Sequence, residues 1–157
     1  MKELSKTTSK VRTSLSLNGK LVILEQTMSM EISNTWRRNE LKVNLKSLSD
    51  RDYQRQVWVE GVMPPGVVHD DFDLAVHFIF DDTDLADDVQ SCIGEFLFNE
   101  GEADCIALVV ESIDAIFRKY GTKENDGFYI NTPEWSDVVL HSERALDKLN
   151  ENDEKIN

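Results

Sequence analysis

The residues best suited to chemistry are two aspartates that flank a histidine in one short segment. Asp73, His77 and Asp81 stand at i, i+4 and i+8, a spacing that puts all three on one face of a helix. Two carboxylates beside an imidazole can ligate a metal ion or carry out acid–base catalysis. A stable metal site needs further ligands, and His69 and His141 have no spacing that supplies them. The simpler interpretation is a surface histidine that hydrogen-bonds one neighbouring aspartate.

The same segment, residues 68–88, concentrates negative charge. Its eight aspartates are Asp70, Asp71, Asp73, Asp81, Asp82, Asp84, Asp87 and Asp88. A calcium loop starting at Asp81 is excluded, because its sixth residue would be Ala86 instead of glycine and its twelfth Cys92 instead of glutamate. Two interpretations stay open, a solvated acidic face and a docking surface for a basic partner. Crowded like charges repel one another, and a basic partner would relieve that repulsion.

Nucleophilic catalysis has little support. Ser91 and Cys92 are not part of a nucleophile elbow, Cys105 falls on an expected core face, and there is no glycine-rich phosphate loop. We therefore expect no enzymatic activity, no cofactor and no bound metal. Two cysteines are too few for a disulfide framework and indicate reduced thiols, as in a cytoplasmic protein.

The charge of the chain is unevenly distributed. The formal net charge is −13 over 157 residues. Residues 1–60 hold eleven lysines and arginines against seven acids, whereas residues 61–157 hold six against twenty-three. Such an acidic body repels nucleic acid and anionic lipid, and it attracts basic proteins. The sequence also has no apolar run long enough to span a membrane and no secretory signal.

Length and hydrophobic periodicity predict a mainly α, single-domain helical bundle of about five helices. Leu41, Leu45 and Leu48 indicate a helix from about Thr35. A second helix is expected after Ser49 as N-cap, and a third after Asp70 or Asp71. The acids Asp81 and Asp82 at the end of that third helix oppose its dipole, which suggests that they serve something other than helix stability.

Two further helices are expected in the C-terminal half. Glu102 to Tyr120 is the longest periodic run, and Gly121 ends it. A polar loop over 122–131 precedes a last helix, with Thr132 as N-cap and Pro133 at its first position. Residues 151–157 are predicted to be a disordered tail.

Residues 1–34 are predicted to be an N-terminal extension. Asn18-Gly19 between two β-prone runs favours a short β-hairpin, and the alternative is an unstructured leader. Trp36, Trp58 and Trp135 stand at periodic positions and are predicted to lie in the core.

Four segments resemble the immunity proteins of bacterial contact-dependent growth inhibition, and the resemblance covers residues 35–150. They are YQRQVWVEG (53–61), DDFDLAVHFIFDDTDL (70–85), IGEFLFNEGEADCIALV (93–109) and PEWSDVVLHSERAL (133–146). The resemblance implies a cytoplasmic antitoxin that binds and neutralises one cognate toxin domain, often a nuclease. Nuclease toxins are basic where they hold phosphate, so an acidic surface could occupy that place.

The expected partner-binding residues are those of the acidic segment. They are Asp70, Asp71, Asp73, His77, Asp81, Asp82 and Asp84. Phe72 and Tyr53 are candidate aromatic anchors for the same interface. The alternative function is a metal-binding protein or a metal-dependent hydrolase that uses Asp73, His77 and Asp81, and a third is a structural subunit.

Overall fold

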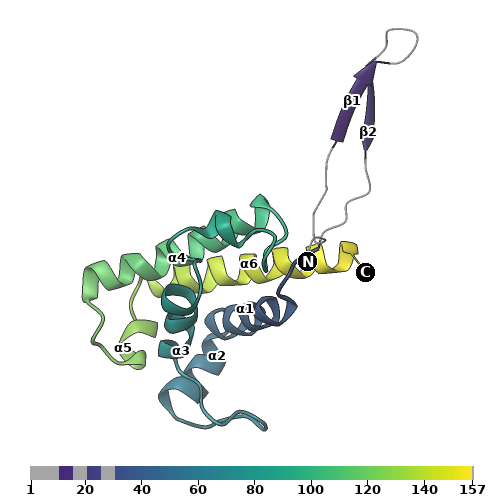
Figure 1. Cartoon of the computed structure of the whole chain (residues 1–157). Coiled ribbons are helices and arrows are strands. Elements are labelled where there is room, and N and C mark those ends of the chain that lie inside the picture. The colour runs from purple at the N-terminus through teal and green to yellow at the C-terminus, as the bar shows by residue number, and fades with distance from the viewer. Residues whose placement is uncertain (1–10, 16–20, 26–30, 157) are drawn as a thin grey trace.

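The computed structural model describes residues 11–15, 21–25 and 31–156 (Figure 1). This part of the chain is mainly helical, as predicted. The helices are α1 (Thr35–Leu48), α2 (Arg51–Tyr53), α3 (Phe72–Val76), α4 (Glu100–Tyr120), α5 (Asp126–Ile130) and α6 (Trp135–Ile156). Two π-helical segments, η1 (Gln54–Val59) and η2 (His77–Asp82), directly continue α2 and α3, and a 3-10 helix, η3 (Val89–Cys92), precedes α4.

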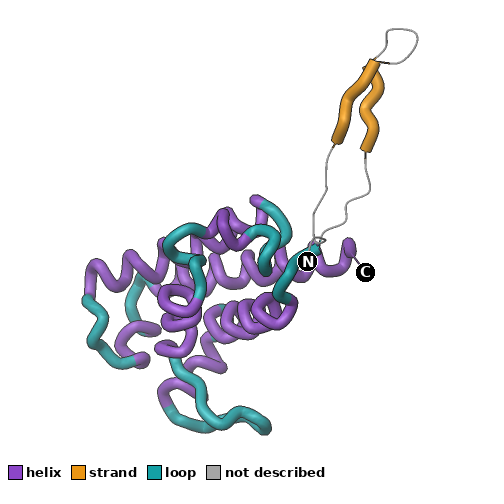
Figure 2. Tube along the Cα trace, in the orientation of Figure 1, coloured by secondary structure: helices purple, strands orange, loops and turns teal. Residues whose placement is uncertain are grey.

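The two longest helices, α4 and α6, lie side by side, and α1 packs against α6 (Figure 2). Each buries the face on which its apolar residues recur with the helical period. In α4 the buried apolar residues include Ile106, Val109, Ile113 and Ile116. In α6 they include Trp135, Val138, Ala145 and Leu149. The apolar residues that recur with the helical period in these two helices therefore lie in the core.

Polar side chains define several helix starts, and two of them differ from the prediction. Asp50, not Ser49, caps α2 by accepting a hydrogen bond from the Tyr53 amide. Thr132 does not cap α6, because its hydroxyl donates backward to the Tyr129 carbonyl at 2.7 Å. Asn125 caps the short helix α5 inside the segment predicted to be a loop. A single turn of helix is too short for its periodicity to be recognised in the sequence.

The predicted disordered tail is wrong for residues 151–156. Helix α6 continues to Ile156. Asn152 is 3% exposed, and its amide donates to Glu102 at 2.9 Å. Asp153 accepts hydrogen bonds from Arg38 and Lys42. Two of the polar residues of this segment therefore contact charged partners in the fold, whereas Glu151, Glu154 and Lys155 are exposed.

Arg38 and Glu102 form a buried ion pair, although charged residue types usually lie at the surface. Their exposures are 3% and 0%, and two hydrogen bonds of 2.9 and 2.8 Å join them. Arg38 also donates to the carbonyls of Phe96 and Leu149, and Glu102 accepts from the Phe98 amide at 2.7 Å. These contacts connect α1, α4 and α6 with the loop that precedes α4.

The tryptophans divide between core and surface. Trp58 and Trp135 are buried as predicted, and both contact the ring of Phe72. Trp36 is 66% exposed, so its predicted place in the core is wrong. It lies about 140° around α1 from Leu41, at 100° per residue, and so points away from the core.

The N-terminal region contains two antiparallel strands, β1 (Val11–Leu15) and β2 (Leu21–Glu25). Val11 is opposite Glu25 and Leu15 is opposite Leu21. The Asn18-Gly19 turn that the sequence predicts lies outside the described residues.

Candidate functional site

The structure brings Asp73, His77 and Asp81 together on the exposed side of α3 and η2. The Nδ1 atom of His77 lies 2.7 Å from a carboxylate oxygen of Asp81, and its Nε2 atom lies 3.3 Å from one of Asp73. All three side chains are more than half exposed. The predicted i, i+4, i+8 alignment is therefore confirmed, although a π-helical segment carries part of it.

The two carboxylates change the protonation of the histidine. The hydrogen bond with Asp81 and the negative charge of Asp73 raise the pKa of His77 above its ordinary value. When protonated, the imidazole donates from both ring nitrogens, and each nitrogen has its own carboxylate acceptor. The arrangement is therefore suited to holding a proton on the ring.

The geometry does not favour a metal site made of Asp73, His77 and Asp81. The carboxylates lie at opposite ring nitrogens of His77 and so do not converge on one point. Across residues 31–156, no group of three or more His, Cys, Asp or Glu side chains is placed to hold a metal ion.

Asp70 and Asp71 face the protein and organise its local structure. One carboxylate oxygen of Asp70 accepts from the Tyr53 hydroxyl at 2.7 Å and from the Trp58 indole at 3.3 Å. Asp71 caps α3 through the Leu74 amide and lies 2.7 Å from the Nε2 atom of His69. Both aspartates are only partly exposed. They are therefore less available to a partner than the sequence suggested.

A hollow of about 640 Å³ lies beside these two aspartates. Its acidic lining residues are Glu60, Asp70, Asp71 and Asp126, and its apolar ones include Trp58 and Met63. Asp126, which the sequence did not indicate, accepts a hydrogen bond from the Phe72 amide at 3.1 Å. Burial raises the pKa of Asp126, and the nearby charge of Asp71 adds to this effect. Each of the three aspartates thus has a structural role at the start of α3.

The remaining predicted acids are exposed. Asp82 ends η2, and Asp84 lies in the turn that follows. Together with Asp73 and Asp81 they form what we call the acidic rim. In the part of the chain that the structure describes, none of these four carboxylates is paired with a lysine or arginine side chain.

Of the two aromatic anchors expected from the sequence, Phe72 is buried and Tyr53 is only partly exposed. Phe72 is 2% exposed and packs in the aromatic core, and the Tyr53 hydroxyl is held by Asp70. The aromatic residue that is exposed near the acidic rim is Trp36. Arg37, the next residue, donates to the Asp82 carbonyl at 3.0 Å, which places the start of α1 against the acidic rim. The one sequence signal for Trp36 was its position out of phase with the three leucines of α1.

Comparison with known proteins gives one match. No curated protein and no solved structure matches the chain. None of the helices in the described residues is long and apolar enough to cross a membrane. The model of a family described as "Domain of unknown function (DUF7945)" matches residues 34–157, which include the whole helical part with the acidic rim, Trp36 and the C-terminal turns of α6. The chain therefore belongs to the family of the domain of unknown function DUF7945.

Proposed function

We propose that this protein is a cytoplasmic antitoxin, which binds a basic toxin domain at the acidic rim and blocks its activity. The observation that carries the proposal is the exposure of Asp73, Asp81 and Asp82 with no lysine or arginine partner in the described residues. Carboxylates crowded into one short segment repel one another, and a basic partner reduces that repulsion.

The location of the acids on η2 supports the proposal. Asp81 and Asp82 stand at the C-terminal end of this segment, where backbone carbonyls already create a negative potential. Acids there weaken the helix end by a few tenths of a kcal/mol each. Helix stability therefore does not explain the presence of Asp81 and Asp82, whereas a docking function does.

The toxin as partner is inferred from the resemblance to growth-inhibition immunity proteins. A nuclease holds phosphate with basic residues, and a negative surface placed over these residues competes with the nucleic acid. Attraction between opposite charges also speeds association, which benefits an inhibitor that must act before its toxin does. The proposal requires no catalytic step by this protein.

A growth assay tests the proposal. We expect the neighbouring reading frame to encode a large secreted protein with the toxin domain at its C-terminus. Production of that domain should stop bacterial growth, and co-production of this protein should restore it. A variant with Asp81→Lys, Asp82→Lys and Asp84→Lys should no longer protect.

A matched control separates the acidic rim from total charge. Glu143, Asp147 and Glu151 lie on the exposed side of α6, and their replacement by lysine changes the net charge by the same amount. This variant should still protect. Equal protection by the two triple variants would disprove the rim as the interface, and failure of the wild-type protein to protect would disprove the antitoxin function.

A further inference from the structure

The outward side of α1 carries two large apolar residues that the described fold leaves uncovered. Trp36 is 66% exposed and Val43 is 68% exposed. They stand at i and i+7 and so lie on one line along the helix, about 10 Å apart. Tryptophan is strongly enriched among the residues that anchor protein interfaces. We call these two residues the apolar strip.

Val43 of the strip also lines a small hollow at the C-terminal end of α1. The hollow has a volume of about 210 Å³, and its lining residues are Val43, Lys46, Ser47, Asp50 and Tyr53. It is large enough for an apolar side chain of a partner. The aliphatic part of the Lys46 side chain can cover such a residue while its ammonium group stays in water.

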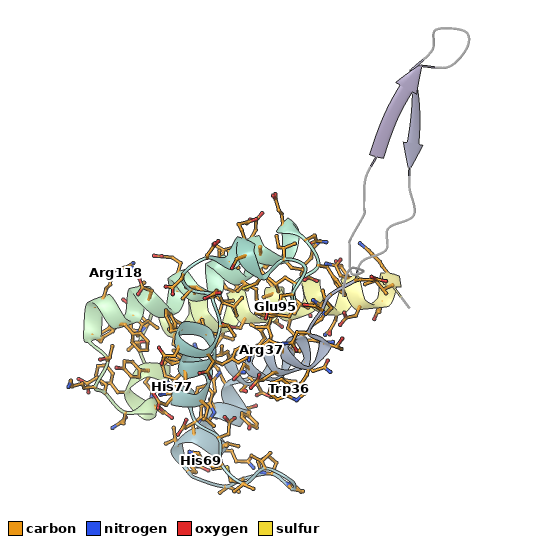
Figure 3. The ribbon with its side chains drawn as sticks, in the orientation of Figure 1. Trp36, Arg37, His69, His77, Glu95 and Arg118 are labelled. Carbon is orange, nitrogen blue, oxygen red and sulfur yellow. The ribbon has the colours of Figure 1, made fainter. Side chains whose placement is uncertain are left out.

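Arg37 connects the apolar strip with the acidic rim. Its guanidinium donates to the Asp82 carbonyl at 3.0 Å and lies 5.8 Å from the centre of the Phe78 ring. The start of α1 and the end of η2 are therefore in direct contact. Figure 3 shows Trp36, Arg37 and His77 on the side of the molecule that faces the viewer. The apolar strip and the carboxylates of the acidic rim thus form one surface.

We propose that the apolar strip is the docking site for an amphipathic, basic helix of the partner. Apolar residues of that helix at i and i+7 would contact Trp36 and Val43, and its lysines or arginines would face the acidic rim. This inference rests on the proposed function, because it names the part of the toxin that the same surface receives. The rim then sets the association rate, and the strip sets the lifetime of the complex.

A second copy of this chain fits the surface less well than a basic helix. Each copy has a net charge of −13, and two copies joined through their strips would bring two acidic rims close together. Like charges at such a contact oppose association. A basic helix neutralises the rim when it covers the strip.

The probe for the experiment is a synthetic helix of about 18 residues, or five turns, made of leucine and lysine with the leucines on one face. A second peptide has the same composition in scrambled order. Calorimetry compares their binding to the wild-type protein and to a Trp36→Ser, Val43→Ser variant. We expect the amphipathic peptide to bind the variant roughly 30-fold more weakly. The scrambled peptide should bind both proteins equally and weakly.

The control variant is Leu108→Ser with Leu140→Ser, which removes two exposed apolar residues from α4 and α6. It should bind the amphipathic peptide as the wild-type protein does. Because all four side chains are exposed, both variants should keep their helix content, which circular dichroism checks. Equal binding of the two peptides, or unchanged affinity of the strip variant, would overturn the inference.

Two further outcomes distinguish this inference from the proposed function. If the wild-type protein sediments as a dimer that the strip variant separates, the strip is a contact between two copies and the inference is wrong. If the Asp81, Asp82 and Asp84 lysine variant binds the amphipathic peptide unchanged, that result counts against the acidic rim and hence the proposed function. In that case the inference about the strip stands if the Trp36→Ser, Val43→Ser variant binds the amphipathic peptide more weakly than the wild-type protein. It is wrong if that variant binds the peptide unchanged.

Discussion

The guanidinium of Arg38 on α1 donates two hydrogen bonds to the carboxylate of Glu102 on α4, at 2.9 and 2.8 Å, with both side chains almost completely buried. This pair satisfies charges that would otherwise be isolated in the core. Asn152 and the Phe98 amide complete the hydrogen bonding of Glu102, and the Phe96 and Leu149 carbonyls accept from Arg38. The helical bundle thus holds a buried ion pair where the starts of α1 and α4 meet the end of α6.

Removal of either partner should strongly destabilise the protein. Arg38→Ala or Glu102→Ala leaves a buried charge without compensation, and we expect a loss of about 3–5 kcal/mol in the free energy of unfolding. Urea denaturation measures this loss. Arg118 is 57% exposed and pairs with Glu111, so Arg118→Ala should change the stability far less than either buried substitution.

The double variant Arg38→Met, Glu102→Leu provides the second half of this test. Because it removes both charges together, it should cost clearly less than the sum of the two single changes. Additive losses would show that the two residues do not act as a pair.

A deletion at the C-terminus should destabilise the protein once it removes Asp153 and Asn152. Deletion of 151–157 removes the Asn152 donor to Glu102 and the Asp153 acceptor of Arg38. We expect a loss of about 1–3 kcal/mol, the usual effect of leaving buried polar groups unsatisfied. Thermal and urea denaturation measure it.

Deletion of 155–157 is the matched control for this truncation. Lys155 and Ile156 are exposed, and the change should stay within about 0.5 kcal/mol. If both truncated proteins were as stable as the full chain, the last turns of α6 would have no part in the core network.

The charge of His77 should depend on Asp81. The hydrogen bond with Asp81 and the charge of Asp73 raise the pKa of His77 in the folded state. The contact therefore stabilises the fold fully below the unfolded pKa of about 6.5. This contribution is lost as the pH rises through the higher folded pKa. In an NMR titration, Asp81→Asn should lower the pKa of His77.

Asp84→Asn is the control for the titration. It removes an exposed acid of the same rim that makes no contact with the imidazole, so the pKa of His77 should change little. An equal decrease in both variants would mean that general negative potential, and not the hydrogen bond, holds the proton.

Much of the fold could be predicted because the relevant signals are local. The leucines of α1 and the isoleucines of α4 mark their buried faces by spacing alone. Asp71 was recognisable as a cap from its place before an apolar run. The alignment of Asp73, His77 and Asp81 likewise follows from helical spacing.

The errors at Arg38 and Asp70 concern positions whose surroundings come from distant parts of the chain. Arg38 is polar, and no pattern within α1 indicates that Glu102, Leu149 and Asp153 meet around it. In the same way, Tyr53 and Trp58 turn Asp70 toward the protein. Such contacts depend on how the helices pack, and they reverse the burial that residue type suggests.

The sequence by itself determined the helical class, the apolar faces of the long helices and the concentration of acids between 68 and 88. These features depend on composition and on periodicity within one element. Only the tertiary structure decided that Asp70 turns toward Tyr53 and Trp58 while Asp81, Asp82 and Asp84 stay exposed. The same packing left Trp36 uncovered beside them, because burial is set by neighbouring helices and not by a residue's own polarity.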